Sequence, residues 1–338
     1  MIVIFLFYFL PGVSMAHHNF TPTHYHSTIG SHEPVLTIQS GDTVSTTTVD
    51  AGGKDKDGNQ ATPGGNPQTG PFYIDGAEPG DSIAVTFDHV MPNRAWGHTS
   101  ARVAANVLDP GYVPKFDDNI SRIIWGIDFE NNTASPVEVC EGSDQTTLGD
   151  GQPTTGYLKK LTLPLNPHPG CFGVAPPRGQ AISTATSSTH GGNMDYKRFN
   201  QGTIVYFPVF VEGALFHIGD GHALQGDGEI VGTGIEISFD VTFTVHLHKG
   251  KTIGWPRGES DTHIYTVGNA RPLDQCIEHA TTEMIRWLKS DYSLDERTIH
   301  VLLGEAVEYD MGNMFDPAYT MVCKVPKSVL ETIGAKRS

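Results

Sequence analysis

The sequence predicts a mainly β protein of the α+β class: a β-sandwich-like body of antiparallel strands, followed by a C-terminal α/β portion that contains two helices. Glycine and proline are frequent, at 38 and 22 of 338 residues, which is typical of short strands joined by turns. Apolar and polar residues alternate without a break over residues 237–247, as in a strand with one buried face. Apolar residues recur at helical spacing only after residue 272.

The first sixteen residues, MIVIFLFYFLPGVSMA, are kept apart from the fold prediction. Their apolar run is too short to span a bilayer, and Ser14 and Ala16 are small residues of the kind that a signal peptidase prefers. A basic segment before the run is missing, and Met15 could itself be the start. The sequence therefore leaves two interpretations of residues 1–16 open, a signal peptide or a mis-assigned upstream start.

The first part of the body, residues 35–115, is predicted to consist of short strands separated by turns. In "PGDSIAVTFDHV" a Gly-Asp turn leads into an alternating strand, so Ile83, Val85 and Phe87 are expected to face the core. Gly52 to Gly70 is rich in glycine, proline and asparagine and is expected to be a loop.

Two longer strands are expected in the second part of the body. "TIVYFPVFV" (203–211) is apolar on both faces, as in a buried strand, and Pro208 should mark a bulge or an edge. "EISFDVTFTVHLH" (236–248) should have one dry face. That face is formed by Ile237, Phe239, Val241, Phe243, Val245 and Leu247.

The C-terminal portion is where helices are expected. Pro272 suits a first helical turn, and the apolar residues that follow it at helical spacing are Leu273, Cys276, Ile277, Ala280, Met284, Trp287 and Leu288. Ser293 and Glu296 have the spacing of a capping box, so a second helix should begin there and continue through "TIHVLLGEAVEY". We therefore predict a β-rich catalytic body over residues 17–268 and a helical portion over 269–338 packed on it.

Composition excludes several classes of partner. The formal charge of −16 is spread along the chain, and no Lys/Arg cluster offsets it, so binding to a nucleic acid backbone is not expected. No membrane partner is expected either. The four cysteines lie far apart without a C-x-x-C pair, which favours free thiols in a reducing compartment, the cytoplasm, unless residues 1–16 direct secretion.

Three glycine-rich clusters within sixty residues carry the residue types of a polar site. They are "NPHPGCFGVAPP" (166–177), "THGGNMD" (189–195) and "GDGHALQGDGE" (219–229). Glycine lets the backbone approach a ligand closely, and carboxylates beside imidazoles are suitable ligands for zinc or calcium. A bound cation would also offset the repulsion among Asp220, Asp227 and Glu229.

Simpler interpretations of the same residues remain open. The acidic stretch could be a solvated turn, since Asp and Gly are common turn residues, and its spacing is not that of an EF-hand. His190 could be a hydrogen-bonded loop histidine, and Asp195 a cap or turn residue. Cys171 could be a nucleophile with His168 near it in sequence, although such a cysteine is more often a buried apolar residue.

Taken together, the clusters resemble the acetamidase/formamidase family. The resemblance rests on "NPQTGPFYIDGAEPGDSIAV" (66–85), "HPGCFGVAP" (168–176), "THGGNMD" (189–195) and "GTIVYFPVFVEGALFHIGDGHALQGDGEIVGTGIE" (202–236). It implies hydrolysis of short aliphatic amides such as formamide or acetamide, a largely β fold, and a homo-oligomer such as a dimer. Bound metal ions are expected on the same basis, and the family pattern falls on Asp220, His222, Asp227 and Glu229 and on His190 to Asp195.

Within that resemblance we assign roles to individual residues. A divalent cation, zinc or calcium, is expected on Asp195, Asp220 and His222, with Asp227 as a further ligand, where it would activate a water and polarise the amide carbonyl. Glu229 is expected to act as general base and proton shuttle, with His190 as reserve acid or ligand. Backbone N–H groups of Gly191, Gly192 or Gly221 could stabilise the oxyanion.

Two other functions fit parts of the sequence. One is a Cys171-dependent amidase, in which the thiolate attacks the amide. The other is a non-catalytic β-sandwich protein that binds calcium through its acidic loops, and through calcium a carbohydrate or a partner.

Overall fold

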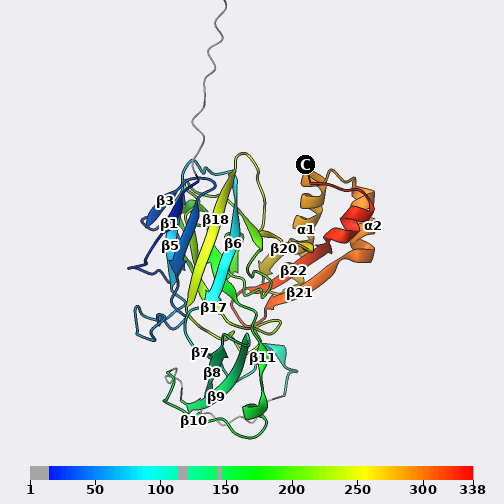
Figure 1. Cartoon of the computed structure of the whole chain (residues 1–338). Helices are drawn as coiled ribbons and strands as arrows, with labels where there is room; N and C mark the ends of the chain where they lie inside the picture. The colour runs from blue at the N-terminus through cyan, green and yellow to red at the C-terminus, as the bar shows by residue number, and fades with distance from the viewer. Residues whose placement is uncertain (1–14, 113–120, 143–146, 338) are drawn as a thin grey trace, which may run out of the picture.

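Two large β-sheets form the body of the protein in the computed structural model, which describes residues 15–112, 121–142 and 147–337 (Figure 1). Residues 1–14 of the N-terminal segment, for which two interpretations are open, lie outside the described residues. The fold is mainly β with a small helical portion, as the sequence predicts.

The larger sheet has nine strands in the order β1-β4-β18-β6-β16-β19-β20-β22-β21. In chain order these are β1 (His17–Asn19), β4 (Thr43–Thr47), β6 (Ser82–Pro92), β16 (Ile204–Pro208), β18 (Phe239–His248), β19 (Arg257–Glu259), β20 (His263–Ala270), β21 (Glu308–Asn313) and β22 (Tyr319–Pro326). Because β20, β21 and β22 extend the sheet of the body, the C-terminal portion is joined to the body by backbone hydrogen bonds as well as by packing.

The second large sheet has six strands in the order β14-β15-β12-β17-β5-β3. They are β3 (Leu36–Ile38), β5 (Gln68–Ile74), β12 (His168–Gly173), β14 (Ser187–Ser188), β15 (Gly191–Asn193) and β17 (Phe216–His222). Apart from β1–β4 and β3–β5, which run parallel, the pairs of named strands in the two sheets are antiparallel. A small pair is formed by β2 (Thr28–Ile29) and β13 (Ile182–Ser183).

Aromatic side chains from both large sheets meet between them, which establishes the sandwich. Phe243 of β18 has its ring centroid 5.2 Å from those of Phe72 and Phe216 in the opposite sheet. Phe87 of β6 lies 5.1 Å from Phe172 of β12 in the same way. Such buried edge-to-face pairs add about 0.5–1.5 kcal/mol each to the burial of their apolar area.

The predicted core faces are confirmed. Ile83, Val85 and Phe87 of β6 are buried, and so are the alternate apolar residues of β18 from Phe239 to Val245. The strand at 203–211 is a buried central strand that ends at Pro208, where it pairs with β6 alone because its pairing with β19 stops at Tyr206, so Pro208 lies at a local edge.

A third, five-stranded sheet forms a lobe below the sandwich in Figure 1. Its strands are β7 (Trp96–Ser100), β8 (Ser121–Asp128), β9 (Thr133–Glu141), β10 (Gln152–Pro153) and β11 (Leu163–Pro164). Short 3-10 turns lie at Ala105–Val107, Leu158–Lys160 and Pro177–Gly179.

The first C-terminal helix, α1 (Leu273–Asp291), is confirmed and packs on β20 and β22. Helix and sheet approach so closely that a Cβ on Gly268 would lie 2.0 Å from the carbonyl oxygen of Cys276. The buried stripe includes Cys276, Ala280, Met284, Trp287 and Leu288, whereas Ile277 is exposed.

The second helix, α2 (Glu296–Ala306), begins later and ends earlier than expected. Asp295, not Ser293, caps it by accepting a hydrogen bond from the backbone N–H of Thr298, and Ser293 lies in the left-handed region with φ of 53°. A short third helix, α3 (Lys327–Thr332), was not predicted. Among the described residues no helix is both long and apolar enough to cross a membrane.

Candidate functional site

The three glycine-rich clusters of the sequence lie side by side in the six-stranded sheet. Strand β12 pairs with β17 on one side and with β15 on the other. His168 is thereby opposite His222, and Cys171 is opposite both Gly219 and Asn193. His168 and His222, 54 positions apart in the chain, are thus neighbours in space, as a single polar site formed by the three clusters requires.

Acidic side chains gather where these strands end. Asp195, His222 and Glu229 each offer one ligand atom, and these atoms lie within 4.8 Å of one another; the same holds for Asp220, His222 and Glu236. All five side chains are buried. His222 belongs to both groups, and its Nε2 lies 3.0 Å from Glu236, 3.5 Å from Asp220 and 3.9 Å from Glu229. We call these five residues the carboxylate cluster.

The carboxylate cluster faces bare backbone at Gly170. A Cβ at that position would lie 2.4 Å from Oδ1 of Asp195, 2.7 Å from Oδ2 of Asp220 and 2.8 Å from the His222 ring. A carbon atom at that position would displace a carboxylate, because distances below about 3 Å are shorter than van der Waals contact. Glycine here lets both carboxylates and the His222 ring approach the backbone closely.

Three acids of the cluster have strained backbone. Asp195, Asp220 and Glu229 have φ of 44°, 57° and 45°, in the left-handed region that side chains other than glycine seldom adopt. Each such residue costs on the order of 1 kcal/mol or more, and such strain gathers at sites of function. The surrounding structure therefore holds these carboxylates in position against a local preference.

Gln225 fixes the orientation of the His222 ring. Its side-chain nitrogen donates to the backbone oxygens of Asp195 at 2.6 Å and Gly312 at 3.1 Å, so its Oε1 faces His222 Nδ1 at 2.9 Å. An amide oxygen only accepts, so Nδ1 of His222 carries a proton and donates it. Nε2 is then the ring nitrogen that the histidine turns toward the carboxylates.

Asn313 holds the acidic groups from the other side. Its Nδ2 lies 2.7 Å from Oδ2 of Asp195, 2.7 Å from Oε2 of Glu229 and 2.8 Å from Oδ2 of Asp316. Asn193 donates a short hydrogen bond to Asp316 as well. Strand β21, which ends at Asn313, thus brings the C-terminal portion into the site.

The electrostatics of the cluster reflect four carboxyl groups around one imidazole, with Asp316 as a fifth carboxyl group beside them. Burial, together with the charges of Glu229 and Asp220, raises the pKa of Asp195 well above its usual range. Burial also raises the pKa of Glu236 to about 7 and that of Asp316 to about 6. For His222 burial opposes protonation, but Glu236 and Asp220 outweigh it and raise its pKa well above the ordinary value.

This donor set suits a divalent cation. Oδ1 of Asp195 is buried beside the Gly170 backbone without a hydrogen-bond partner among the described residues, and Nε2 of His222 is buried among carboxylates, with Glu236 at 3.0 Å. Clustered carboxylates repel each other unless protons or a cation offset their charge. Two carboxylates and one imidazole are donors that zinc accepts.

Not every predicted site residue joins the cluster. Asp227 does not, because its side chain is 60% exposed and pairs with Lys197 at 2.8 Å. Gly191 and Gly192 lie in β15 between β12 and β14, and a Cβ on them would meet Phe172 O at 2.6 Å and Thr186 O at 2.4 Å. Their glycine character serves close packing of the sheet, which gives no support to an oxyanion role.

Cys171, near Asp220 and Asp195, and His190, directly before β15, are buried and are not part of the carboxylate cluster. Both ring nitrogens of His190 lack a hydrogen-bond partner among the described residues, and burial lowers its pKa to about 4. Burial also raises the pKa of the Cys171 thiol well above its usual value, with Asp220 and Asp195 adding to the effect. A thiol in that setting resists forming the thiolate that nucleophilic catalysis requires.

Sequence reasoning missed Gln225, Glu236 and Asn313. Glu236 stands between the buried residues Ile235 and Ile237, so simple alternation assigns it to a solvent-exposed face. In the structure that opposite face is the carboxylate cluster. Asn313 lies 84 positions after Glu229 and has no local signal.

Two buried histidines predict how stability depends on pH. Burial lowers the pKa of His190 to about 4 and that of His217 to about 3, from an ordinary value of 6.5. Between these values the unfolded chain binds protons that the folded chain does not, so each histidine should lower the free energy of unfolding by up to about 1.4 kcal/mol per pH unit as pH falls from about 6.5 toward 4. The buried carboxyl groups with raised pKa contribute the opposite slope, so urea unfolding of the wild type is compared with that of His217→Gln, and an unchanged slope in the variant contradicts the assignment.

Comparisons with known proteins agree with this architecture. Residues 178–332 match the model of the acetamidase/formamidase family. The acetamidase structure from Yersinia enterocolitica is 31% identical, with 94% of each chain covered and a TM-score of 0.77. The acetamidase structure from Bacillus halodurans is 27% identical, with 94% of this chain and all of that chain covered and a TM-score of 0.75.

A curated relative, the acetamidase of Mycolicibacterium smegmatis, is 28% identical over 243 residues. That match covers 61% of this chain and 58% of the relative, so the chain spans little more than half the length of this protein.

Proposed function

The chain belongs to the acetamidase/formamidase family, and from this premise we propose that it hydrolyses short aliphatic amides such as formamide and acetamide to the carboxylate and ammonia. The observation that carries the proposal is the buried carboxylate cluster around His222, which lies against the bare backbone of Gly170. Catalytic groups with strongly shifted pKa values gather in such sites.

In this proposal Asp195, Asp220 and His222 would hold a divalent cation. Zinc suits an imidazole and two carboxylates better than calcium, which prefers oxygen ligands alone. When bound, such a cation supplies Lewis acidity, which lowers the pKa of a water and polarises the amide carbonyl. Gln225 and Glu236 position the His222 ring by contacts on its two nitrogens.

Glu229 moves the proton. Its carboxylate would take a proton from the attacking water and deliver it to the nitrogen that leaves as ammonia, which splits the C–N bond and leaves the carboxylate product. Asn313 holds Oε2 of Glu229 at 2.7 Å, so the carboxylate has one fixed oxygen and one that faces His222 at 3.9 Å. This arrangement orients the base without occupying both of its oxygens.

Chelator treatment tests the proposal. The purified chain is expected to release ammonia from formamide or acetamide, to contain a divalent metal by elemental analysis, and to lose activity when stripped. Activity should return when zinc is added. Full activity in metal-free protein would exclude the cation's part in the mechanism, and no ammonia from any small amide would exclude the amidase itself.

The same assay separates the proposal from a calcium-dependent binding protein. Such a protein would retain calcium and release no ammonia. Within "GDGHALQGDGE" only Asp227 is exposed, as a solvated calcium-binding loop would require, while Asp220 and Glu229 are buried.

Assembly and location also belong to the proposal. A homodimer is expected from the family resemblance, and light scattering of the purified chain would measure it. A cytoplasmic location fits four buried free cysteines, and mass spectrometry of the native N-terminus would show whether residues 1–16 are kept.

A further inference from the structure

A second polar cavity lies on the outer face of the nine-stranded sheet, beside the C-terminal end of α1. Its volume is about 610 Å³, within the range of small-molecule sites. The lining comes from β6, β16, β18, β19, α1 and the C-terminal tail, and none of its residues belongs to the carboxylate cluster. The residues that matter here are Ser82, Tyr206, His248, Lys251, Arg257 and Arg337.

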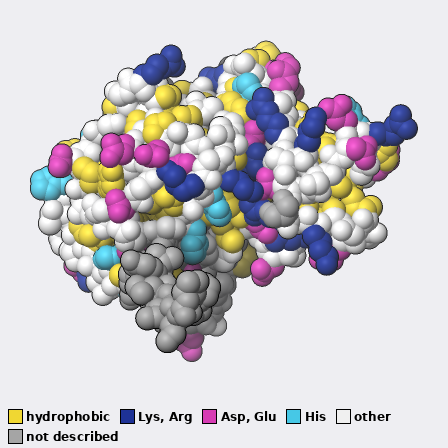
Figure 2. All heavy atoms as spheres, turned by 90° about the horizontal axis from the view of Figure 1, so that it is seen from above, with side chains coloured by type: hydrophobic (Ala, Val, Ile, Leu, Met, Phe, Trp, Pro, Cys, Tyr) yellow, Lys and Arg dark blue, Asp and Glu magenta, His cyan; other side chains and the backbone are white. Residues whose placement is uncertain are grey.

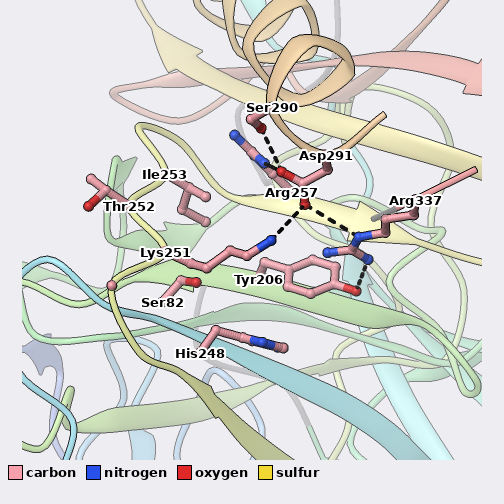
Figure 3. A pocket seen from close by; sticks show the side chains of 11 residues that line it. Ser82, Tyr206, His248, Lys251, Thr252, Ile253, Arg257, Ser290, Asp291 and Arg337 are labelled. Carbon is pink, nitrogen blue, oxygen red and sulfur yellow. Dashed lines mark hydrogen bonds and ion pairs between the residues drawn. The ribbon is translucent and has the colours of Figure 1, made fainter. Parts of the chain in front are cut away.

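Three cationic side chains converge on one carboxylate in this cavity (Figure 3). Asp291 lies 3.4 Å from Nε of Arg337, and 3.9 Å from both Lys251 and Arg257. The last two distances are too long for hydrogen bonds, so these cations are attracted to Asp291 without a close pair there. Lys251 keeps its donors for another acceptor.

The ion-pair network around the cavity carries an excess of positive charge. Its cations are Lys251, Arg257, Arg286, Lys327 and Arg337, and its carboxylates are Glu259, Glu283 and Asp291. Of these, three cations, Lys251, Arg257 and Arg337, line the cavity together with one carboxylate, Asp291, whereas Glu259 and Glu283, which pair with Arg337 and Arg257, are not among the lining residues. In a chain with a formal charge of −16, that local excess runs against the overall balance. On the face in Figure 2, by contrast, Lys and Arg side chains stand among Asp and Glu without forming a continuous basic band.

The two arginines are held rigidly, as in a prepared site. Arg257 is bonded to the fully buried Glu283 at 2.7 and 2.8 Å, and its guanidinium lies over the Trp287 ring. Arg337 donates to the Tyr206 hydroxyl at 2.6 Å and lies over the Tyr206 ring at 4.7 Å. Little conformational entropy remains to be lost when such donors bind a ligand.

Neutral groups complete the lining. Burial, followed by the charge of Arg337, lowers the pKa of His248, so its ring stays uncharged at neutral pH and adds no further cation. Tyr206 and Ile253 offer apolar surface beside the charged wall. The cavity thus combines a cationic wall with room for an organic body.

We propose that this cavity binds a small organic anion whose recognised group carries two negative charges, either a phosphate monoester or a dicarboxylate. Two charges on the ligand suit a lining of three cations and one carboxylate, and Nζ of Lys251 and Nη1 of Arg257, each 3.9 Å from Asp291, supply donors. The site is separate from the amide chemistry, so the proposal stands or falls independently of the proposed function.

Calorimetric titration of the full chain at constant ionic strength tests it, with inorganic phosphate, glycerol phosphate and succinate as probes and sodium chloride as the control salt. One probe class is expected to bind at a single site with a Kd of about 1 mM or lower. Lys251→Met should weaken that binding about tenfold, since it removes one charged donor. Its matched control is Lys289→Met, which removes the same charge from an exposed pair with Glu296 outside the cavity.

Binding of the phosphates alone identifies a phosphate ester as ligand, and binding of succinate alone identifies a dicarboxylate. Arg337→Gln provides a second variant and should weaken binding to a similar extent. The proposal is overturned if no probe binds saturably, or if Lys251→Met and Lys289→Met bind the probe equally well.

Discussion

Replacing Glu229 with glutamine is expected to lower kcat for a short amide by about 10²- to 10⁴-fold, the usual contribution of a general base. The variant keeps the size of the side chain and can still contact Asn313, so the fold and the affinity for metal should change little. KM should stay close to its wild-type value, because Glu229 is assigned to proton transfer and not to substrate binding. Steady-state ammonia release measures both constants.

Asp227→Asn is the matched control, two residues earlier on the same loop. Asp227 is exposed and paired with Lys197, so its loss should change kcat by no more than about twofold, as for most exposed ion pairs. Equal losses in the two variants would contradict the division that the structure makes between these neighbouring acids. An undiminished kcat in Glu229→Gln would remove Glu229 from the mechanism.

The sequence alone predicts those parts of the site that lie in local patterns. Glycine beside histidine and aspartate in three short segments indicated where Asp195, Asp220, His222 and Glu229 would meet, because tightly packed strands require glycine at the points of contact. Asp227 shares every local feature of Glu229, and only the path of the loop turns one outward and the other inward. A side chain's direction in an irregular loop is a property of the tertiary structure, which composition does not encode.

Alternation and helical spacing predicted β6, β18 and α1, because each buries one regular face against the core. The start of α2 was misplaced since Ser293 and Asp295 are both good capping residues, and packing decides between them. Asn313 could not be found for a different reason. It reaches the site through the pairing of β21 with β22, a contact made at the far end of the nine-stranded sheet.

Replacing Gly170 with alanine tests the geometry of the cluster itself. The added methyl group would lie 2.4 Å from Oδ1 of Asp195 and 2.7 Å from Oδ2 of Asp220, so at least one carboxylate has to move. A displacement of about 1 Å at a catalytic site can cost about 10²-fold in rate, and we expect kcat/KM to fall by that factor or more. Metal content should fall in parallel, as elemental analysis would show, and overpacking should lower the free energy of unfolding by about 1–3 kcal/mol.

Gly304→Ala separates this effect from the general consequences of adding a methyl group. Gly304 lies in α2 with no heavy atom within 4 Å of its Cβ position, so alanine there should leave activity and metal content unchanged and stabilise the helix by roughly 0.5–1 kcal/mol. If Gly170→Ala kept full activity and metal content, the close approach of Asp195 and Asp220 to the Gly170 backbone would not be part of the site where cation and substrate meet.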